Sequence, residues 1–81
     1  MDRIGSIVII IKDRVNNAPK INQLLSEFSD IILARVGLPF KEKGVHIINL
    51  IINGSTDQIG SLTGKIGSLP GVTVKSILAK Q

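Results

Sequence analysis

The chain of 81 residues contains no cysteine, tryptophan or tyrosine, and its only aromatic residues are two phenylalanines. The lack of cysteine excludes disulfides, thiolate zinc sites and iron–sulfur clusters, which often stabilise small domains. A small domain without such crosslinks or metals is usually stabilised by association with further subunits. No apolar run approaches the about 18–20 residues that cross a bilayer, since the longest is Ile4–Ile11. We therefore expect no contact with a membrane.

The charge of the chain is moderately positive. Ten basic and six acidic residues give a formal net charge of +4, and no window holds an uninterrupted basic run. Such a surplus attracts phosphates weakly but does not indicate a nucleic-acid-binding protein. The start of the sequence has no pattern typical of a signal peptide. These features predict a cytoplasmic protein. Among its possible partners, nucleic acid is less expected than a small metabolite or another protein.

Apolar runs along the chain predict four strands. They cover Ile4–Ile11, Ile31–Leu38, Val45–Ile52 and Val72–Leu78. The first and third strands carry isoleucine, leucine or valine at both alternate sets of positions, which is typical of strands covered on both faces. Pro39 is expected to end the second strand, and Phe40–Gly44 to form the loop that follows.

Apolar residues at helical spacing predict two amphipathic helices between these strands. The first is expected to open at Ala18-Pro19 with Asn16 or Asn17 as its cap, and the second to follow a cap at Ser55 or Thr56. Their apolar stripes consist of Ile21, Leu24, Leu25 and Phe28 in the first and of Ile59, Leu62, Ile66 and Leu69 in the second. Ser29-Asp30 and Pro70-Gly71 are expected to end them.

The element order β-α-β-β-α-β predicts a single α+β domain over residues 1–81. The expected architecture is a ferredoxin-like sandwich, a four-stranded antiparallel sheet with two helices on one face. Two helices cover only one face of the sheet, yet the strands are apolar on both. A second copy of the chain is the simplest cover for the other face, so we expect a dimer or tetramer that associates through this apolar face.

Few residues could carry catalysis or bind a metal. An RNA-recognition motif of this fold requires aromatic residues on its central strands, and a metallochaperone requires paired cysteines. The sequence has neither, which excludes both classes. His46 is the only histidine, and Glu42 is the only acid in its region, which favours a structural role for that side chain. No serine or threonine has an evident histidine–acid partnership. We expect no enzyme activity, no metal and no cofactor.

Three features suit binding or assembly. The first is Lys12–Asn17, where the backbone N–H groups of a helix start and the Arg14 guanidinium suit a carboxylate or phosphate, although an ordinary capped turn explains the same residues. The second is Arg35, which alternates with Ile31 and Leu33 and is either a ligand or interface anchor or an edge charge that discourages aggregation. The third is the set Gly60, Gly64 and Gly67 on the second helix, which either permits close approach of a backbone or ligand or is simply tolerated.

The segments Lys12-Asp13-Arg14, Ala34–Gly44, Leu62–Gly67 and Gly71–Lys75 resemble the iron-only hydrogenase system regulators. This family of small ACT-like proteins is also similar to the C-terminal domain of the nickel-responsive regulator. The most specific parts of the resemblance are Arg-Val-Gly-Leu-Pro and Leu-Thr-Gly-Lys-Ile-Gly. The nickel site of that regulator uses several histidines and a cysteine, so nickel sensing is not transferred to a chain with one histidine and no cysteine.

The resemblance implies an oligomeric regulatory module that senses a small molecule. ACT domains typically hold an amino acid near the first strand–helix loop at a subunit interface, which implies ligand contacts from Asp13, Arg14 and Asn16. Arg35 is a further candidate for ligand binding, from its place on the second strand alone. No DNA-binding segment is expected before Ile4, so an effect on transcription would require a partner protein. The alternative is a protein-interaction or oligomerisation module with no ligand.

Overall fold

The computed structural model describes residues 2–80 and confirms the predicted order of elements. Its strands are β1 (Arg3–Ile11), β2 (Ile32–Phe40), β3 (Val45–Gly54) and β4 (Val72–Leu78). Two α-helices, α1 (Arg14–Glu27) and α2 (Thr56–Gly67), separate β1 from β2 and β3 from β4. Two single turns of 3-10 helix, η1 (Ser29–Ile31) and η2 (Lys41–Lys43), flank β2.

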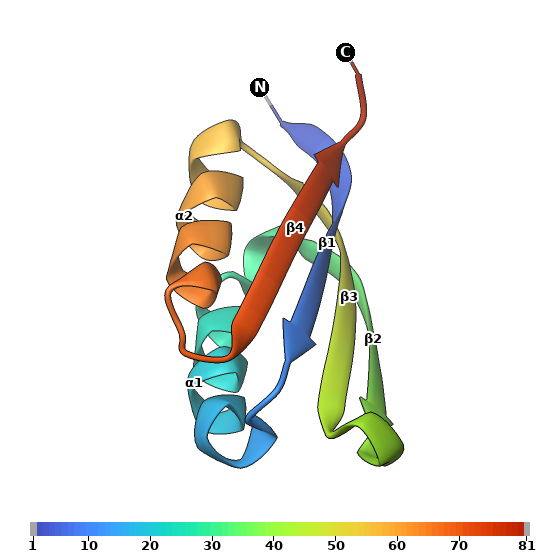
Figure 1. Ribbon diagram of the computed structural model, residues 1–81. Helices are drawn as coiled ribbons and strands as arrows, with labels where there is room; N and C mark the ends of the chain where they lie inside the picture. The colour runs from blue at the N-terminus through green and yellow to red at the C-terminus, as the bar shows by residue number, and fades with distance from the viewer. Residues whose placement is uncertain (1, 81) are drawn as a thin grey trace.

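The four strands form one antiparallel sheet in the order β2-β3-β1-β4. Both helices lie on the same side of this sheet, and the start of β1 lies beside the end of β4 at one end of the sheet (Figure 1). The predicted ferredoxin-like sandwich is therefore confirmed. Among residues 2–80, neither helix has the length and apolar content needed to cross a membrane.

The hydrophobic core fills the space between the helices and the face of the sheet that they cover, which we call the inner face. β1 and β3 contribute three buried residues each, and the helices contribute residues from their predicted apolar stripes. The core consists of Ile7, Ile9, Ile11, Ile21, Leu25, Ile31, Ile48, Leu50, Ile52, Ile59, Leu62 and Ile66. Leu24, Phe28 and Leu69 pack against its rim and are partly buried, which confirms both predicted stripes.

The opposite face of the sheet, which we call the outer face, is apolar and exposed in the single chain. Eight large apolar side chains there have exposed fractions from 36% to 75%, namely Ile4, Val8, Ile10, Val36, Leu38, Phe40, Ile51 and Ile77. Polar side chains interrupt them: the Ser6 hydroxyl donates to Asn49 Oδ1 over 2.7 Å, and Lys75 and Thr73 of β4 pair with Val8 and Ile10. The prediction that the second face of the sheet is apolar is therefore confirmed.

Helix α1 begins earlier than the sequence predicts. Its cap is Asp13 and not Asn16 or Asn17, because the Asp13 carboxylate accepts the backbone N–H of Asn16 at 3.4 Å. Asn17 lies inside the helix and is only 3% exposed. Its side-chain amide donates to the carbonyl of Pro70 over 2.8 Å. Pro19 consequently lies inside α1 and not in its first turn. The predicted cap at Ser55 is confirmed, since Ser55 and Gln58 form a capping box at the start of α2.

Strand β2 continues beyond the residue that was expected to end it. Pro39 lies within the strand opposite His46, and pairing extends to Phe40. The reason is the position of β2 at the edge of the sheet, where a missing N–H can face away from the neighbouring strand. At the other end of β2, Ile31 belongs to the preceding 3-10 turn, and the strand begins at Ile32.

The glycines of α2 lie on the surface of the single chain. A Cβ atom added at Gly60 or Gly64 would meet no other atom within 4 Å, apart from its own helix backbone and chain neighbours, whereas one at Gly67 would lie 3.0 Å from Val74 Cγ1. Close packing within the chain therefore explains Gly67 but not Gly60 or Gly64.

Candidate functional site

The turn between β1 and α1 holds three of the four residues predicted to bind a ligand. Asp13 and Asn16 are bonded to each other, because the Asn16 side-chain amide donates to Asp13 Oδ2 over 2.8 Å in addition to the backbone bond of the cap. Arg14 is the first residue of α1 and is exposed. Asp13 and Asn16 thus stabilise the helix start, and Arg14 is the predicted residue whose charge is available there.

The β1–α1 turn is tied to the start of β4. The N–H of Lys12 donates to the carbonyl of Gly71 over 2.9 Å, and Asn17 donates to the neighbouring Pro70 carbonyl. Gly71 has a positive φ of 75°, which favours glycine. These bonds fix the start of α1 against the loop before β4, so the turn is held in place by tertiary contacts as well as by its cap.

A basic pocket of about 330 Å³, which we call the loop pocket, lies beside this turn. Its walls come from the turn itself and from the β2–β3 connection, which lies beyond α1 and β2 in the sequence. The lining residues are Lys12, Asp13, Arg14, Val15, Pro39, Lys41, Gly44 and Val45. Three cations and one carboxylate, which already accepts two hydrogen bonds, thus line the pocket, and this balance of charge suits an anionic ligand.

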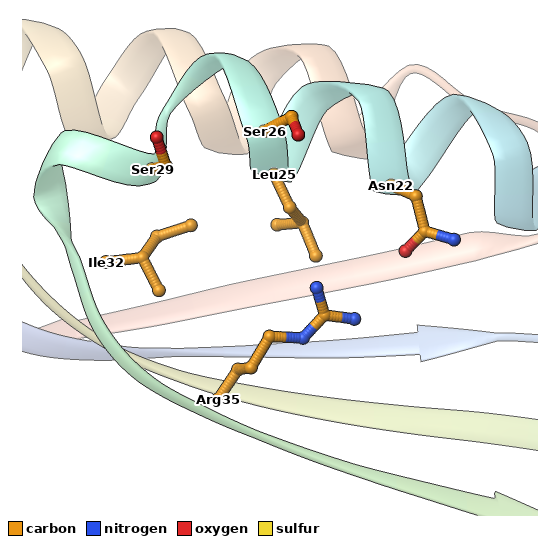
Figure 2. Close-up of a pocket in the computed structure, with 6 residues that line it drawn as sticks. All are labelled: Asn22, Leu25, Ser26, Ser29, Ile32 and Arg35. Carbon is orange, nitrogen blue, oxygen red and sulfur yellow. The ribbon is translucent and has the colours of Figure 1, made fainter.

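A second pocket of about 390 Å³, which we call the α1–β2 pocket, lies between helix α1 and the edge strand. Arg35 extends from β2 toward α1 there, and Leu25 and Asn22 point from the helix toward it (Figure 2). The other lining residues are Ser26, Ser29 and Ile32. The structure therefore places Asp13 and Arg14 at one pocket and Arg35 at another, while Asn16 lines neither.

His46 lies on the inner face near both arginines. It pairs with Ile11 of β1 and with Pro39 of β2, and a Cβ atom at Gly37 would lie 3.2 Å from its Nε2 atom. Burial lowers the pKa of the imidazole from its ordinary value of 6.5, and the charges of Arg14 and Arg35 lower it further. The lowered pKa of His46 therefore reflects its burial first and the two arginine charges second.

The lowered pKa of His46 predicts that the protein loses stability as the solution becomes acidic. Because the folded state disfavours the protonated imidazole, unfolding takes up a proton below the ordinary pKa of 6.5. This contribution to stability is complete above that pH and declines as the pH falls toward the lowered value. The check is urea unfolding between about pH 7.5 and 5.5, with His46→Gln expected to show a flatter profile. An equal slope in both proteins would contradict the prediction.

Several residues of the two pockets were not singled out from the sequence. Lys41, Pro39 and Val45 reach the loop pocket from a connection that only the sheet order brings there. A signal did exist for the α1–β2 pocket: Asn22, Ser26 and Ser29 follow one another at i, i+4 and i+7, beside the apolar stripe. Within residues 2–80, no three acidic or histidine side chains gather as a metal site.

Solved structures define the class of protein to which this geometry belongs. The chain is similar to the ACT domain of a GTP pyrophosphokinase from Chlorobium tepidum, with a TM-score of 0.79 and 26% identity over 95% of this chain and 100% of that one. It shares its fold with CPII, a nitrogen regulatory PII-like protein from Thiomonas intermedia K12, at a TM-score of 0.53 and 14% identity over 98% and 92% of the two chains. The molecule is an ACT-like module, of a fold shared with regulatory proteins.

The family follows from a closer similarity. The family model described as "TM1266-like: Iron-only hydrogenase system regulator, putative" matches residues 3–76. Protein TM1266 from Thermotoga maritima has a structure with a TM-score of 0.95 to this one, and the two are 39% identical over 99% of this chain and 100% of that chain. The chain therefore belongs to the TM1266-like family, as its motifs predict. A search of curated proteins gives no match.

Proposed function

We propose that this chain is a small oligomeric regulatory protein that binds an anionic metabolite in the loop pocket, at a subunit interface. The observation that carries the proposal is the charge of that pocket. Lys12, Arg14 and Lys41 line a cavity whose size falls in the range of small-molecule sites. The family, which is described as one of regulators, agrees with a binding role.

The ligand would be bound by direct charge and by the helix start. The Arg14 guanidinium offers a planar pair of donors to a carboxylate or phosphate, and the lysines add point charges. The positive end of the α1 dipole favours the same sign of ligand. Val15 and Val45 supply an apolar wall on which the rest of a small metabolite, such as an amino acid, can pack.

Self-association is proposed from the outer face of the sheet. Large apolar patches on a small protein usually mark an interaction surface, and the eight exposed side chains of the outer face form such a patch on all four strands. Burial of this face against a second copy would contribute about 25 cal/mol for each Å² of apolar surface removed from water. A dimer or tetramer would thereby gain the stability that a short chain lacks alone.

The regulatory step that we propose is a shift between subunit arrangements. A ligand bound at a subunit interface favours the arrangement that it contacts best, and a partner protein responds to the change in population. The hydrogenase connection comes from the description of the family, and a role in transcription would act through such a partner. A cytoplasmic location stays a prediction from the sequence.

A module without a ligand is the second candidate function. The observation that favours it is the bond between Asp13 and Asn16, because two of the predicted ligand residues are occupied as an ordinary helix cap. In that case the outer face would join subunits or dock a partner, and the basic side chains of the loop pocket would only be solvated.

Native mass spectrometry of the protein as purified, followed by a thermal screen of the standard amino acids and nucleotides, distinguishes the two. We expect an oligomer and at least one compound that raises the melting temperature, since a ligand at a hundred times its dissociation constant stabilises by about 2.7 kcal/mol. Arg14→Ala should abolish the thermal response and leave the oligomer intact. Lys20→Ala, which removes an exposed cation of the same helix outside both pockets, is the matched control.

The outcomes separate clearly. An oligomer that no compound stabilises would support the ligand-free module and contradict sensing. A response that survives in Arg14→Ala would show that the ligand is bound elsewhere. A monomer under all conditions would contradict the role of the outer face.

A further inference from the structure

A β-bulge determines the direction of Arg35. Ile32 pairs with Ile52, but Ala34 already pairs with Ile51, so the strand contains one extra residue at this point. The extra residue, Leu33, reverses the alternation of the strand. Arg35 therefore pairs with Leu50, which is fully buried on the inner face. Regular alternation from Ile32 would instead have placed Arg35 on the outer face.

The bulge thus turns a guanidinium toward the underside of α1. Bulges often redirect a side chain next to a binding or active site. In Figure 2, Arg35 rises from β2 toward α1, and Leu25 points from the helix toward its nitrogen atoms. A cavity of about 390 Å³ separates the strand from the helix at this place, so the side chain lines open space and not a packed core.

The chemistry of the pocket walls is mixed. Three neutral polar side chains, Asn22, Ser26 and Ser29, follow one edge of α1 and η1, and Leu25 and Ile32 provide the apolar part. Among the described residues 2–80, Arg35 is the only charged one on the walls, and no carboxylate lines them. None of the side-chain hydrogen bonds among residues 2–80 uses its guanidinium.

We propose that the α1–β2 pocket binds a small monocarboxylate with a short branched apolar chain. Arg35 would hold the carboxylate through its two parallel N–H groups, and a single cation matches a single negative charge. The apolar chain would pack on Leu25 and Ile32. Asn22 and the two serine hydroxyls can both donate and accept, so they suit an oxo, hydroxyl or amino group next to the carboxylate.

This site goes beyond the proposed function and does not depend on the loop pocket. The two pockets share no lining residue, and they differ in charge: three cations at one, one at the other. The single cation of the α1–β2 pocket suits one carboxylate, whereas the three cations of the loop pocket also suit a ligand with several negative charges. Loss of binding at one site is therefore distinguishable from loss at the other.

The test is a titration of the isotope-labelled protein followed by amide resonances in NMR spectra. The probes are 4-methyl-2-oxopentanoate, L-leucine and 4-methylpentanoate, which share a carboxylate and a branched chain and differ next to the carboxylate. Succinate and inorganic phosphate serve as controls without an apolar chain. We expect saturable shifts at Asn22, Ser26 and Ser29 with at least one branched probe, and a dissociation constant of about 1 mM or lower.

Variants then assign the binding to Arg35. Arg35→Ala should weaken binding about 10- to 100-fold, the loss typical of a charged hydrogen-bond partner. Arg35→Lys keeps the charge and the fold but loses the paired N–H groups, and should weaken binding about tenfold. Arg14→Ala, at the loop pocket, should leave it unchanged. The pKa of His46 gives a second readout in the Arg14→Ala variant, since a bound carboxylate that neutralises Arg35 should still raise it there.

Three results would overturn the proposal. The first is the absence of saturable shifts with all three branched probes. The second is unchanged affinity in Arg35→Ala and Arg35→Lys. The third is a set of shifts confined to residues of the loop pocket. If Arg35→Ala aggregates more than the parent protein but binds every probe with the same affinity, the pocket is not a ligand site. The charge of Arg35 then protects the edge strand from pairing with other chains.

Discussion

Replacing Leu38 by glutamate is expected to convert the proposed oligomer into a folded monomer. Leu38 lies in β2 on the outer face and is 57% exposed in the single chain, so the substitution removes little from the core of the protomer. In an assembly that buries this face, the same carboxylate would be desolvated without a partner. Such a group costs several kcal/mol, and we expect the dissociation constant to rise at least about 100-fold.

Sedimentation velocity over a range of protein concentrations measures the change, and circular dichroism checks that the fold persists. Gln23→Glu is the control, because Gln23 is an exposed residue of α1 that lines neither pocket and lies away from the outer face. It should leave the oligomer intact. If Leu38→Glu sediments like the parent protein, subunits associate through another surface.

The sequence predicts the sheet well where its pattern is regular. In β1 and β3 both alternate sets of residues are apolar, and the structure places one set in the core and the other on the outer face. Strand β2 is different, because its alternation is interrupted by the bulge at Leu33. A single extra residue reverses the faces of all residues that follow it, and no residue type in Ile31–Leu38 marks that position. The direction of Arg35 could therefore not be predicted from alternation.

The start of α1 shows a similar limit. Asp13, Asn16 and Asn17 are all residue types that cap helices, so local preference alone does not choose among them. The choice depends on a contact across the fold. Asn17 is buried against the loop before β4 and donates to Pro70, a residue 53 positions away in the sequence. With that bond in place, Asn17 lies inside the helix and the cap is Asp13.

The candidate site was also only partly predictable, because some of its residues are contiguous in the sequence and others meet only in the folded chain. Lys12–Asn17 is contiguous, so its charges and helix start could be recognised from the sequence. Lys41 joins Arg14 at the loop pocket only through the arrangement of β2 and β3 beside β1. The polar stripe of Asn22, Ser26 and Ser29 was visible at helical spacing, but its meaning depends on Arg35 facing it.

Replacing Leu50 by alanine is expected to destabilise the protomer by about 2–5 kcal/mol, the usual loss for a buried leucine. Leu50 is fully buried in β3 and belongs to the core between the sheet and the helices. A domain of this size is stabilised by only about 4–12 kcal/mol. The substitution therefore removes a large part of the total, and at the lower end of that range it unfolds the chain.

The measurement is urea unfolding in the Leu38→Glu background, where unfolding is not coupled to dissociation. Leu33→Ala is the matched control, since it makes the same change at an exposed leucine of the neighbouring strand (61%) and should cost less than about 1 kcal/mol. A loss below about 1 kcal/mol for Leu50→Ala would mean that the core relaxes into the cavity. Leu50 and Leu38 lie in paired strands on opposite faces of one sheet, so one is expected to determine folding and the other assembly.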